Sequence, residues 1–259
     1  MSLHRFFLSE ALPPDSSKHA VRLPLSAADV HHCLTVLRLR PDARIVVVAP
    51  DRTSSVVCIT QLGAESVMGI VTEALPAVFA PRVTLIQGLA KGDKLDLIVE
   101  KVTEIGVEAV VPVSFARSVV KLDAERSLKR GERLRRVAMS AAKQSQRSFV
   151  PTISDPVAVA ALPELLAWFD VVLVAWEEDR DASGIGAALT AGAATSESRI
   201  AIVVGPEGGL TQAEVDSLCA NGALRVSLGS TVLRTETAGI LSAALCVYEC
   251  GGLGGRVRD

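Results

Sequence analysis

From residue 83 onward, short apolar runs alternate with longer segments whose apolar residues repeat at helical spacing. Expected strands cover residues 83–90, 107–113, 169–176, 199–205 and 224–228, and expected helices cover 94–106, 124–147, 211–222 and 235–249. Parallel strands must be joined by long crossovers, which are usually helices. The alternation therefore predicts an α/β domain built on a mainly parallel, doubly wound sheet.

The first 73 residues have a different pattern. Three short runs rich in β-branched residues, at 44–49, 54–60 and 67–74, are separated by turn residues. One helix is expected after Ser26, which has capping-box spacing to Asp29. Two prolines interrupt "ALPAVFAPR" (74–82), so we place a domain boundary there. We expect a small β-barrel or sandwich at 1–73 and the α/β domain at 74–259.

Composition excludes several classes of protein. No window reaches the roughly 18–20 uncharged apolar residues that span a membrane, and the start, "MSLHRFFLSE", lacks the apolar core of a signal peptide. The five cysteines are odd in number and lack paired metal-ligand spacing, which favours free thiols and no metal site. We expect a soluble cytoplasmic protein.

Charge is unevenly distributed along the chain, although the net charge is only −2. Residues 117–147 contain ten Lys or Arg against three Asp or Glu, whereas residues 150–220 contain two against eleven. A basic block on an otherwise acidic chain indicates a polyanionic partner. The alternative is a solvated helix face, and charge alone favours neither interpretation.

The turn "GPEGG" (205–209) lies between an expected strand and an expected helix. Ligands of parallel sheets bind beyond the carboxyl ends of the strands, and Thr211 with Glu214 forms a capping box that opens the helix. Such a helix start suits phosphate. However, neither a Walker loop nor a dinucleotide fingerprint is present, and Glu207 would repel a phosphate. A ligand with a positive centre and no phosphate fits better, and the alternative is a turn that serves only folding.

A second stretch, "VSLGSTVLRTETAGI" (226–240), repeats this design, with a strand ending at Gly229 and a helix beginning near Thr235. We expect the two turns to follow adjacent strands and to form one pocket lined by main-chain amides and carbonyls. Such a wall suits the adenine and ribose of a nucleoside. Arg234 either serves this pocket or pairs with Glu236 beside the helix start.

Five motifs occur in order over nearly the whole chain: "RFF…HHCLTVLRLRPDARIVV", "KGDKLDLIVEKVTEIGV", "RSVVKLDAERSLKRGERLRRVAMSAAKQS", "VVGPEGGLTQAEV" and "LGSTVLRTETA". Together they resemble the ribosomal RNA small subunit methyltransferase E family of the SPOUT superfamily. The resemblance implies a homodimer that uses S-adenosylmethionine to methylate N3 of a uridine in 16S ribosomal RNA, within the small subunit or its late precursor. It also implies a PUA-like RNA-binding β-barrel at 1–73 and a SPOUT domain with a C-terminal deep trefoil knot at 74–259.

The cofactor-binding residues that this resemblance implies lie at the end of one strand and in both turns: Leu173, Val174, Gly205, Glu207, Gly208, Leu228, Gly229, Leu233, Arg234, Glu236, Thr237 and Ala238. Arg234 and Glu236 are also the candidate catalytic residues. Arg234 would anchor the RNA or stabilise negative charge on the uracil oxygens. Glu236, Glu207 or a water that they orient would accept the N3 proton.

The sequence departs from the family pattern at several positions near these motifs. Ser230-Thr231 replaces a common Pro-Arg, Trp176 replaces a common His, and the block usually reading EQxGR is "KQSQR" at 143–147. These departures leave both turns intact and bear on the RNA contacts.

The residues expected to contact RNA phosphates are basic, one in the N-terminal domain and six in the basic block: Arg38, Arg117, Lys121, Arg126, Arg135, Arg136 and Arg147. Aromatic residues make up only 3% of the chain, so we expect recognition of folded RNA shape rather than base stacking. Two alternatives stay open, an enzyme acting on a ribose 2′-hydroxyl or another RNA, and a non-catalytic RNA-binding protein. A nucleotide kinase or phosphatase is disfavoured because the turns lack a phosphate-binding lysine.

Overall fold

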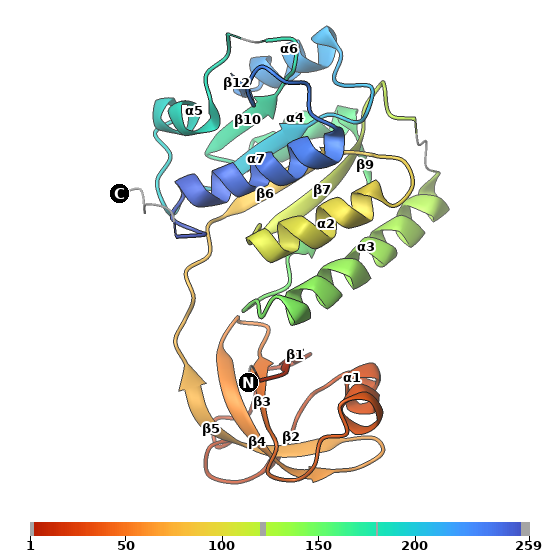
Figure 1. The fold of residues 1–259 in the computed structure, drawn as a ribbon, viewed down its shortest axis with the longest axis vertical. Coiled ribbons are helices and arrows are strands. Elements are labelled where there is room, and N and C mark those ends of the chain that lie inside the picture. Colours follow the sequence, from red (N-terminus) through yellow and green to blue (C-terminus); the bar gives the residue numbers. More distant parts are fainter. Residues whose placement is uncertain (1–2, 120–122, 180, 255–259) are drawn as a thin grey trace. The chain divides into compact units, whose positions relative to one another are not determined.

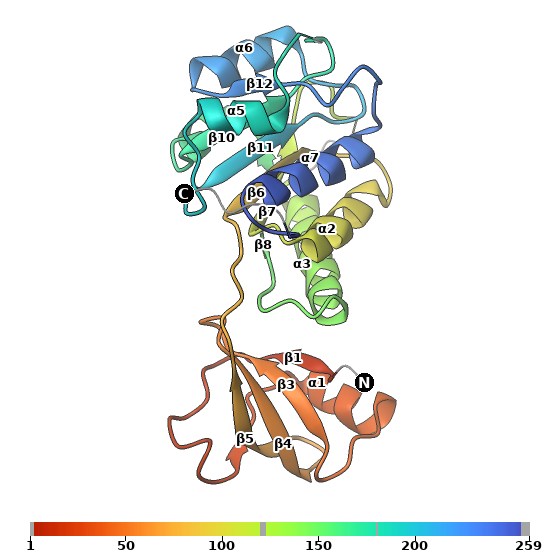
Figure 2. The same ribbon diagram turned by 60° about the vertical axis from the view of Figure 1, so that its left-hand side comes forward.

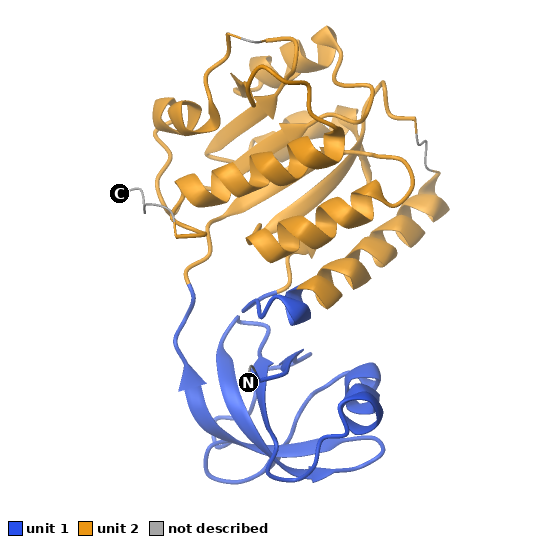
Figure 3. Cartoon of the chain, in the orientation of Figure 1, with its two compact units in different colours: residues 1–78, 142–149 blue, residues 79–141, 150–259 orange. Residues whose placement is uncertain are grey.

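The computed structural model describes residues 3–119, 123–179 and 181–254. The chain divides into two compact units, residues 1–78 with 142–149 and residues 79–141 with 150–259 (Figure 3). The division falls after residue 78 rather than after residue 73, because strand β5 (Val67–Leu75) runs past the expected boundary. The inclusion of 142–149 in the first unit joins segments far apart in the chain, which no local pattern predicts.

The first unit is a five-stranded sheet with one short helix (Figure 1). The strand order is β1-β3-β4-β5-β2, where β1 pairs with β3 in parallel and the other pairs are antiparallel. Helix α1 (Ala27–His31) continues into one π-helical turn, η1 (His32–Val36). Ser26 Oγ accepts the Asp29 N–H at 3.1 Å, which confirms the predicted helix start. The remaining strands are β1 (Arg5–Phe7), β2 (Val21–Arg22), β3 (Arg44–Val48) and β4 (Ser54–Leu62).

The segment 142–149 contributes side chains to this first unit. Lys143 forms an ion pair with Asp29, and Arg5 Nη1 donates a hydrogen bond to the Arg147 carbonyl at 3.0 Å. The Arg147 guanidinium also lies 4.4 Å from the centre of the buried Phe149 ring. These contacts explain why the basic block ends inside the first unit rather than on a free helix face.

The second unit is built on a parallel sheet with strand order β12-β10-β11-β6-β7-β8, and β9 also pairs with β7. This confirms the predicted α/β fold with a parallel sheet. Every residue of β10 and β11 is buried, as expected for strands covered on both faces. The strands are β6 (Val83–Gly88), β7 (Ala109–Ser114), β8 (Thr152–Ile153), β9 (Val157–Ala158), β10 (Val171–Ala175), β11 (Ile200–Val204) and β12 (Leu224–Val226).

Helices cover both faces of this sheet (Figures 1 and 2). One face packs against α2 (Lys94–Ile105), α3 (Ala124–Gln144), α5 (Ile185–Ala191) and α7 (Thr235–Glu249). The other face packs against α4 (Leu162–Leu166), which follows the 3-10 turn η2 (Val159–Ala161), and against α6 (Gln212–Ala220). The sequence predicted α2, α3, α6 and α7, but α4, α5, β8 and β9 are too short to show a periodicity.

All strands of the parallel sheet end at the same edge. The segments that follow β6, β10, β11 and β12 therefore gather there, and they include both turns singled out in the sequence. Among the described residues, no helix combines the length and the apolar character that a membrane crossing requires.

Candidate active site

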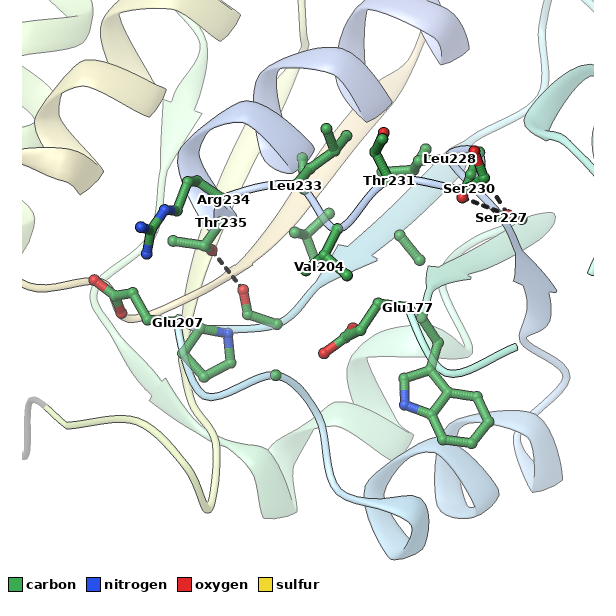
Figure 4. A pocket seen from close by; sticks show the side chains of 18 residues that line it. Glu177, Val204, Glu207, Ser227, Leu228, Ser230, Thr231, Leu233, Arg234 and Thr235 are labelled. Atoms are coloured by element: carbon green, nitrogen blue, oxygen red, sulfur yellow. Dashed lines mark hydrogen bonds between the residues drawn. The ribbon is translucent and has the colours of Figure 1, made fainter. Parts of the chain in front are cut away.

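A cavity of about 370 Å³ opens at the carboxyl-end edge of the parallel sheet (Figure 4). The segments that follow β10, β11 and β12 supply most of its wall, and the start of α7 completes it. The lining residues are 175–177, 204–207, Gly209, 227–235 and Ala238. Because this edge is where ligands of parallel α/β sheets bind, the cavity is the candidate site.

The structure brings together seven of the twelve residues expected to bind a cofactor: Gly205, Glu207, Leu228, Gly229, Leu233, Arg234 and Ala238 line the cavity. The others lie nearby but are not part of its wall. Leu173 and Val174 are fully buried inside β10, and the Gly208 carbonyl accepts a hydrogen bond from Arg117 at 3.2 Å. Glu236 and Thr237 lie in the first turn of α7 and do not line the cavity.

The two glycine-bearing turns do not follow adjacent strands, which corrects the sequence prediction. Strand β10 lies between β11 and β12 in the sheet, although it precedes both in the chain. The turns still meet, because the segment after β12 crosses back toward β11 to begin α7. As a result, the residues that follow β10 form part of the cavity wall. Trp176 and Glu177 are among them, and the sequence did not predict either as a site residue. The position of Glu177 directly after an expected strand was the signal that could have found it.

A buried polar network ties the two turns together beneath the cavity. The Thr235 hydroxyl donates to the Gly205 carbonyl at 2.6 Å, and Gln87 Nε2 donates to the Thr235 hydroxyl at 3.0 Å and to the Gly205 carbonyl at 3.4 Å. Gln87 lies at the end of β6 and is fully buried, while its Oε1 has no hydrogen-bond partner among the described residues. A buried polar group without a hydrogen-bond partner is costly, and the Gln87 amide accepts this cost at one atom. We infer that its other atom, Nε2, serves to position Thr235 against Gly205.

Lys94 lies between two of the acidic residues that the sequence singled out. Its Nζ is 3.5 Å from the Glu207 carboxylate and 3.1 Å from the Glu236 carboxylate, and the Lys91 N–H donates to Glu207 at 3.0 Å. A hydrogen bond from its own backbone N–H and the charge of Lys94 lower the pKa of Glu236. Partial burial raises the pKa of Glu207, but the Lys91 N–H and Lys94 lower it by more. Both carboxylates are therefore ionised near pH 7, and they share the single positive charge of Lys94.

Arg234 is the N-cap residue of α7 and lines the cavity. Its side chain is exposed and forms no hydrogen bond or ion pair with any described residue. The alternative in which Arg234 pairs with Glu236 is wrong, because Glu236 pairs with Lys94. The guanidinium is therefore free to bind an anionic or carbonyl-bearing group.

The helix that follows the GPEGG turn begins as the sequence predicts. Thr211 and Glu214 form a complete capping box, and Glu214 Oε1 also accepts the Ala116 N–H at 2.7 Å. Gly209 has φ +71°, a conformation that side chains rarely adopt. The turn is thus fixed at both ends by contacts that do not involve a ligand.

Four of the seven arginines and lysines expected to bind RNA are engaged within the protein. Arg117 donates to two carbonyls of the 205–211 segment, Arg126 lies 3.5 Å from Asp123, and Arg135 lies 3.0 Å from Asp155. Burial lowers the pKa of Arg147 to about 10, with Arg52 adding to the effect. These side chains have partners within the chain, so fewer charges of the basic block are free than its composition indicates, although exposed pairs such as Arg126 with Asp123 add little stability.

The other three residues of that set differ in environment. Arg38 and Arg136 are exposed and form no hydrogen bond or ion pair with the rest of the described chain. Lys121 lies outside the described residues. Within the described part of the basic block, Arg136 is therefore the predicted phosphate contact whose guanidinium remains free.

Comparisons with known proteins agree on one family. The RNA methyltransferase domain family matches residues 79–247. The chain is 33% identical over 254 residues to ribosomal RNA small subunit methyltransferase E of Bacillus subtilis, covering 95% of this chain and 97% of that one. A crystal structure of the same-named protein of Neisseria gonorrhoeae bound to S-adenosylmethionine is 29% identical, with a TM-score of 0.78 and coverage of 94% and 96%. A solved structure described as a hypothetical protein is 32% identical with a TM-score of 0.86 and coverage of 95% and 98%.

Proposed function

Because the chain belongs to the ribosomal RNA small subunit methyltransferase E family, we propose that it methylates N3 of a specific uridine in 16S ribosomal RNA with S-adenosylmethionine as methyl donor. The observation that carries the proposal is the cavity shared by the 205–209 turn and the 227–235 segment. The Neisseria gonorrhoeae relative, which binds this donor, supports it.

The cavity fits S-adenosylmethionine in size and in chemistry. Its volume of about 370 Å³ lies in the range of small-molecule sites, roughly 300–1,000 Å³. The apolar side chains of Val204 and Leu228 and the main chain of Gly205 and Gly229 suit an adenosine. Arg234 is the one basic residue among those that line the cavity, so a triphosphate would lack counter-charges. When bound, the cofactor supplies a methyl group on a sulfonium that a nucleophile can attack.

The residues around α7 supply what the transfer to uracil requires. Loss of the N3 proton leaves negative charge on the uracil oxygens, and the unpaired Arg234 guanidinium is placed to stabilise it. A hydrogen bond from its own backbone N–H, with the charge of Lys94, keeps the pKa of Glu236 below its usual value, which makes it a weak base. We therefore assign Glu236 the role of positioning Lys94, and the N3 proton is transferred through a water that Glu207 or Glu236 orients, because an ionised carboxylate is a stronger base than water alone.

The proposed partner is 16S ribosomal RNA in the small subunit or its late precursor, which implies activity in the cytoplasm. The free guanidinium groups of Arg38 and Arg136 support contacts to phosphates. The first unit, a small sheet of antiparallel hairpins with one added parallel strand, is the proposed PUA-like RNA-binding domain. Phosphate contacts of this kind add affinity and salt dependence without reading sequence.

The proposal includes a homodimer. Helix α7 exposes two large apolar side chains three positions apart, Leu245 and Tyr248, which are 36% and 49% exposed. Apolar side chains gathered on one helix face mark an interaction surface. Analytical ultracentrifugation tests this part: Tyr248→Glu should shift a dimer toward monomer, and a wild-type chain that sediments as a monomer at micromolar concentration would refute it.

The proposal also includes a deep trefoil knot in the C-terminal segment. Support comes from the strand order, which places β10 between the later strands β11 and β12, and from α7, which packs back against β6 and β11. The contact between Thr235 and Gly205 brings the two crossing segments together. An experimental structure in which the chain could be pulled straight from both ends would contradict this topology.

The decisive experiment uses small subunits from a strain that lacks the methylation. The purified chain and labelled cofactor should place the label on a uridine base, identified as 3-methyluridine by mass spectrometry of digested RNA. Arg234→Ala should lose most of this activity while still binding the cofactor, and Arg199→Ala, which removes an arginine outside every proposed contact set, serves as the matched control. Label on a ribose would favour the 2′-hydroxyl alternative, and failure to bind the cofactor by calorimetry would favour a non-catalytic RNA-binding protein.

A further inference from the structure

Two carboxylates belong to residues that line the cavity, Glu177 and Glu207, and their environments differ. Glu207 is occupied by the Lys91 N–H and by Lys94. Glu177 forms no hydrogen bond or ion pair with any described residue. Figure 4 shows the Glu177 side chain extending across the cavity toward the turn after β11, whereas Glu207 lies at the opposite margin. Of the two carboxylates, that of Glu177 is therefore the one without a hydrogen bond or ion pair among the described residues, whereas Glu207 shares Lys94 with Glu236.

The turn after β11 leaves room for this carboxylate. A Cβ added at Gly209 would lie 2.3 Å from Glu177 Oε1, closer than real atoms approach. The position of Glu177 itself follows from the strand order, because β10 is the central strand of the three whose following segments form the wall. The neighbouring Glu178 is exposed and does not line the cavity, so the two adjacent acids have different surroundings.

Much of the wall around Glu177 is apolar, with Val204, Leu228, Val232 and Leu233 among the lining residues. A carboxylate beside an apolar wall attracts a cation more strongly than one in bulk water, because the local dielectric is lower. We propose that Glu177 is the counter-charge for the sulfonium centre of the cofactor and selects the charged methyl donor over its neutral product. This inference rests on the proposed function and assigns the selectivity to one side chain.

Methyl transfer removes the positive charge that Glu177 would attract, and this loss affects product release. The bond between the methyl carbon and sulfur breaks, its electron pair stays on sulfur, and the methyl forms a bond to N3 as the N3 proton leaves through a water that Glu207 or Glu236 orients. Sulfur changes from a cationic sulfonium to a neutral thioether, so the attraction to Glu177 disappears at that step. The same residue therefore favours donor binding and product release.

Isothermal titration calorimetry with S-adenosylmethionine and S-adenosylhomocysteine tests the proposal on the full chain. Glu177→Gln should weaken donor binding by about 5- to 20-fold, a range that discounts full burial because the side chain is exposed. Binding of the product should change by less than about twofold on the same reasoning. Glu178→Gln, which removes the same charge one residue away, should leave both affinities near wild type. Glu177→Asp, which keeps the charge, should retain most of the preference for the donor.

The outcomes of these titrations distinguish an error in the role of Glu177 from an error in the proposed function. Equal loss of both ligands in Glu177→Gln would assign the carboxylate to the α-amino group that both share, and would overturn the inference. Unchanged affinities would also overturn it. Sinefungin, which carries an amine in place of the sulfonium, should behave like the donor. A wild-type chain that binds none of the three ligands would refute the proposed function itself, and thermal melting of each variant shows whether it is folded.

Discussion

Replacing Gly239 with alanine tests whether the buried Gln87 amide sets the contact between the two turns. Gly239 lies in the second turn of α7, and a Cβ there would come within 2.3 Å of Gln87 Oε1 and 3.4 Å of its Cδ. Gln87 is fully buried and donates to Thr235 and to the Gly205 carbonyl. The amide therefore cannot move away from the new methyl group without losing these hydrogen bonds.

One stabilising and two destabilising contributions decide how Gly239→Ala changes the free energy of unfolding. Alanine in a helix interior is more favourable than glycine by about 1 kcal/mol. An extra carbon in a packed core costs about 1–3 kcal/mol. Loss of the Gln87 hydrogen bond to Thr235 costs roughly 1 kcal/mol more. The unfavourable contributions are larger, so we expect Gly239→Ala to lower the free energy of unfolding by about 1–3 kcal/mol.

Urea unfolding followed by circular dichroism measures this change, and a double-mutant cycle isolates its cause. In a Gln87→Ala background the steric conflict is absent, so Gly239→Ala should stabilise the protein by about 1 kcal/mol through helix propensity. The effect of the same substitution thus changes sign between the two backgrounds. Equal destabilisation in both would refute the argument, because the cost would then come from α7 itself.

Three further predictions concern single side chains. Thr211→Ala removes the capping box of α6 and should lower the free energy of unfolding by about 1 kcal/mol, measured by urea unfolding. Asp170→Asn should lower the melting temperature at pH 7, because a hydrogen bond from Arg199 lowers the pKa of Asp170 from 3.8 to about 2. This contribution is present above pH 3.8 and is lost as the pH falls through about 2, so an equal difference at pH 7 and pH 2 would contradict it. Arg136→Ala should weaken binding to 16S ribosomal RNA and reduce the slope of log K against log salt by about 0.7–0.9, whereas Arg126→Ala, already paired with an acid, should change it less.

The elements that the sequence predicted correctly are those defined by neighbouring residues. Ser26 and Thr211 cap helices through side chains three positions from their partners, and Gly106 ends α2 in a left-handed conformation. Helix α7 begins at Thr235, as its sequence indicates. Capping, periodicity and left-handed glycines act over a few residues, so the order of amino acids is sufficient to locate them.

Contacts between distant segments decide which basic side chains are free, and the sequence could not predict them. The count of basic residues between 117 and 147 indicated a polyanionic partner, but it did not show that several of these charges pair with acids from elsewhere in the fold. Arg130 and Arg133 bind Asp96 of α2, and Arg135 binds Asp155. Net charge is a property of composition, whereas free charge depends on which acids the fold brings near.

Local patterns in this chain determine the parallel α/β class, the starts of the long helices and the glycine turn where β11 ends. Only the tertiary structure decides that β10 separates β11 from β12, so that Glu177 enters the cavity and Lys94 reaches Glu207 and Glu236. The physical reason is the separation in sequence between the residues that interact. Backbone hydrogen bonds and caps are satisfied within a few residues, but strand order and ion pairing are settled by packing between segments more than 100 residues apart, as in the hydrogen bond from the Lys91 N–H to Glu207.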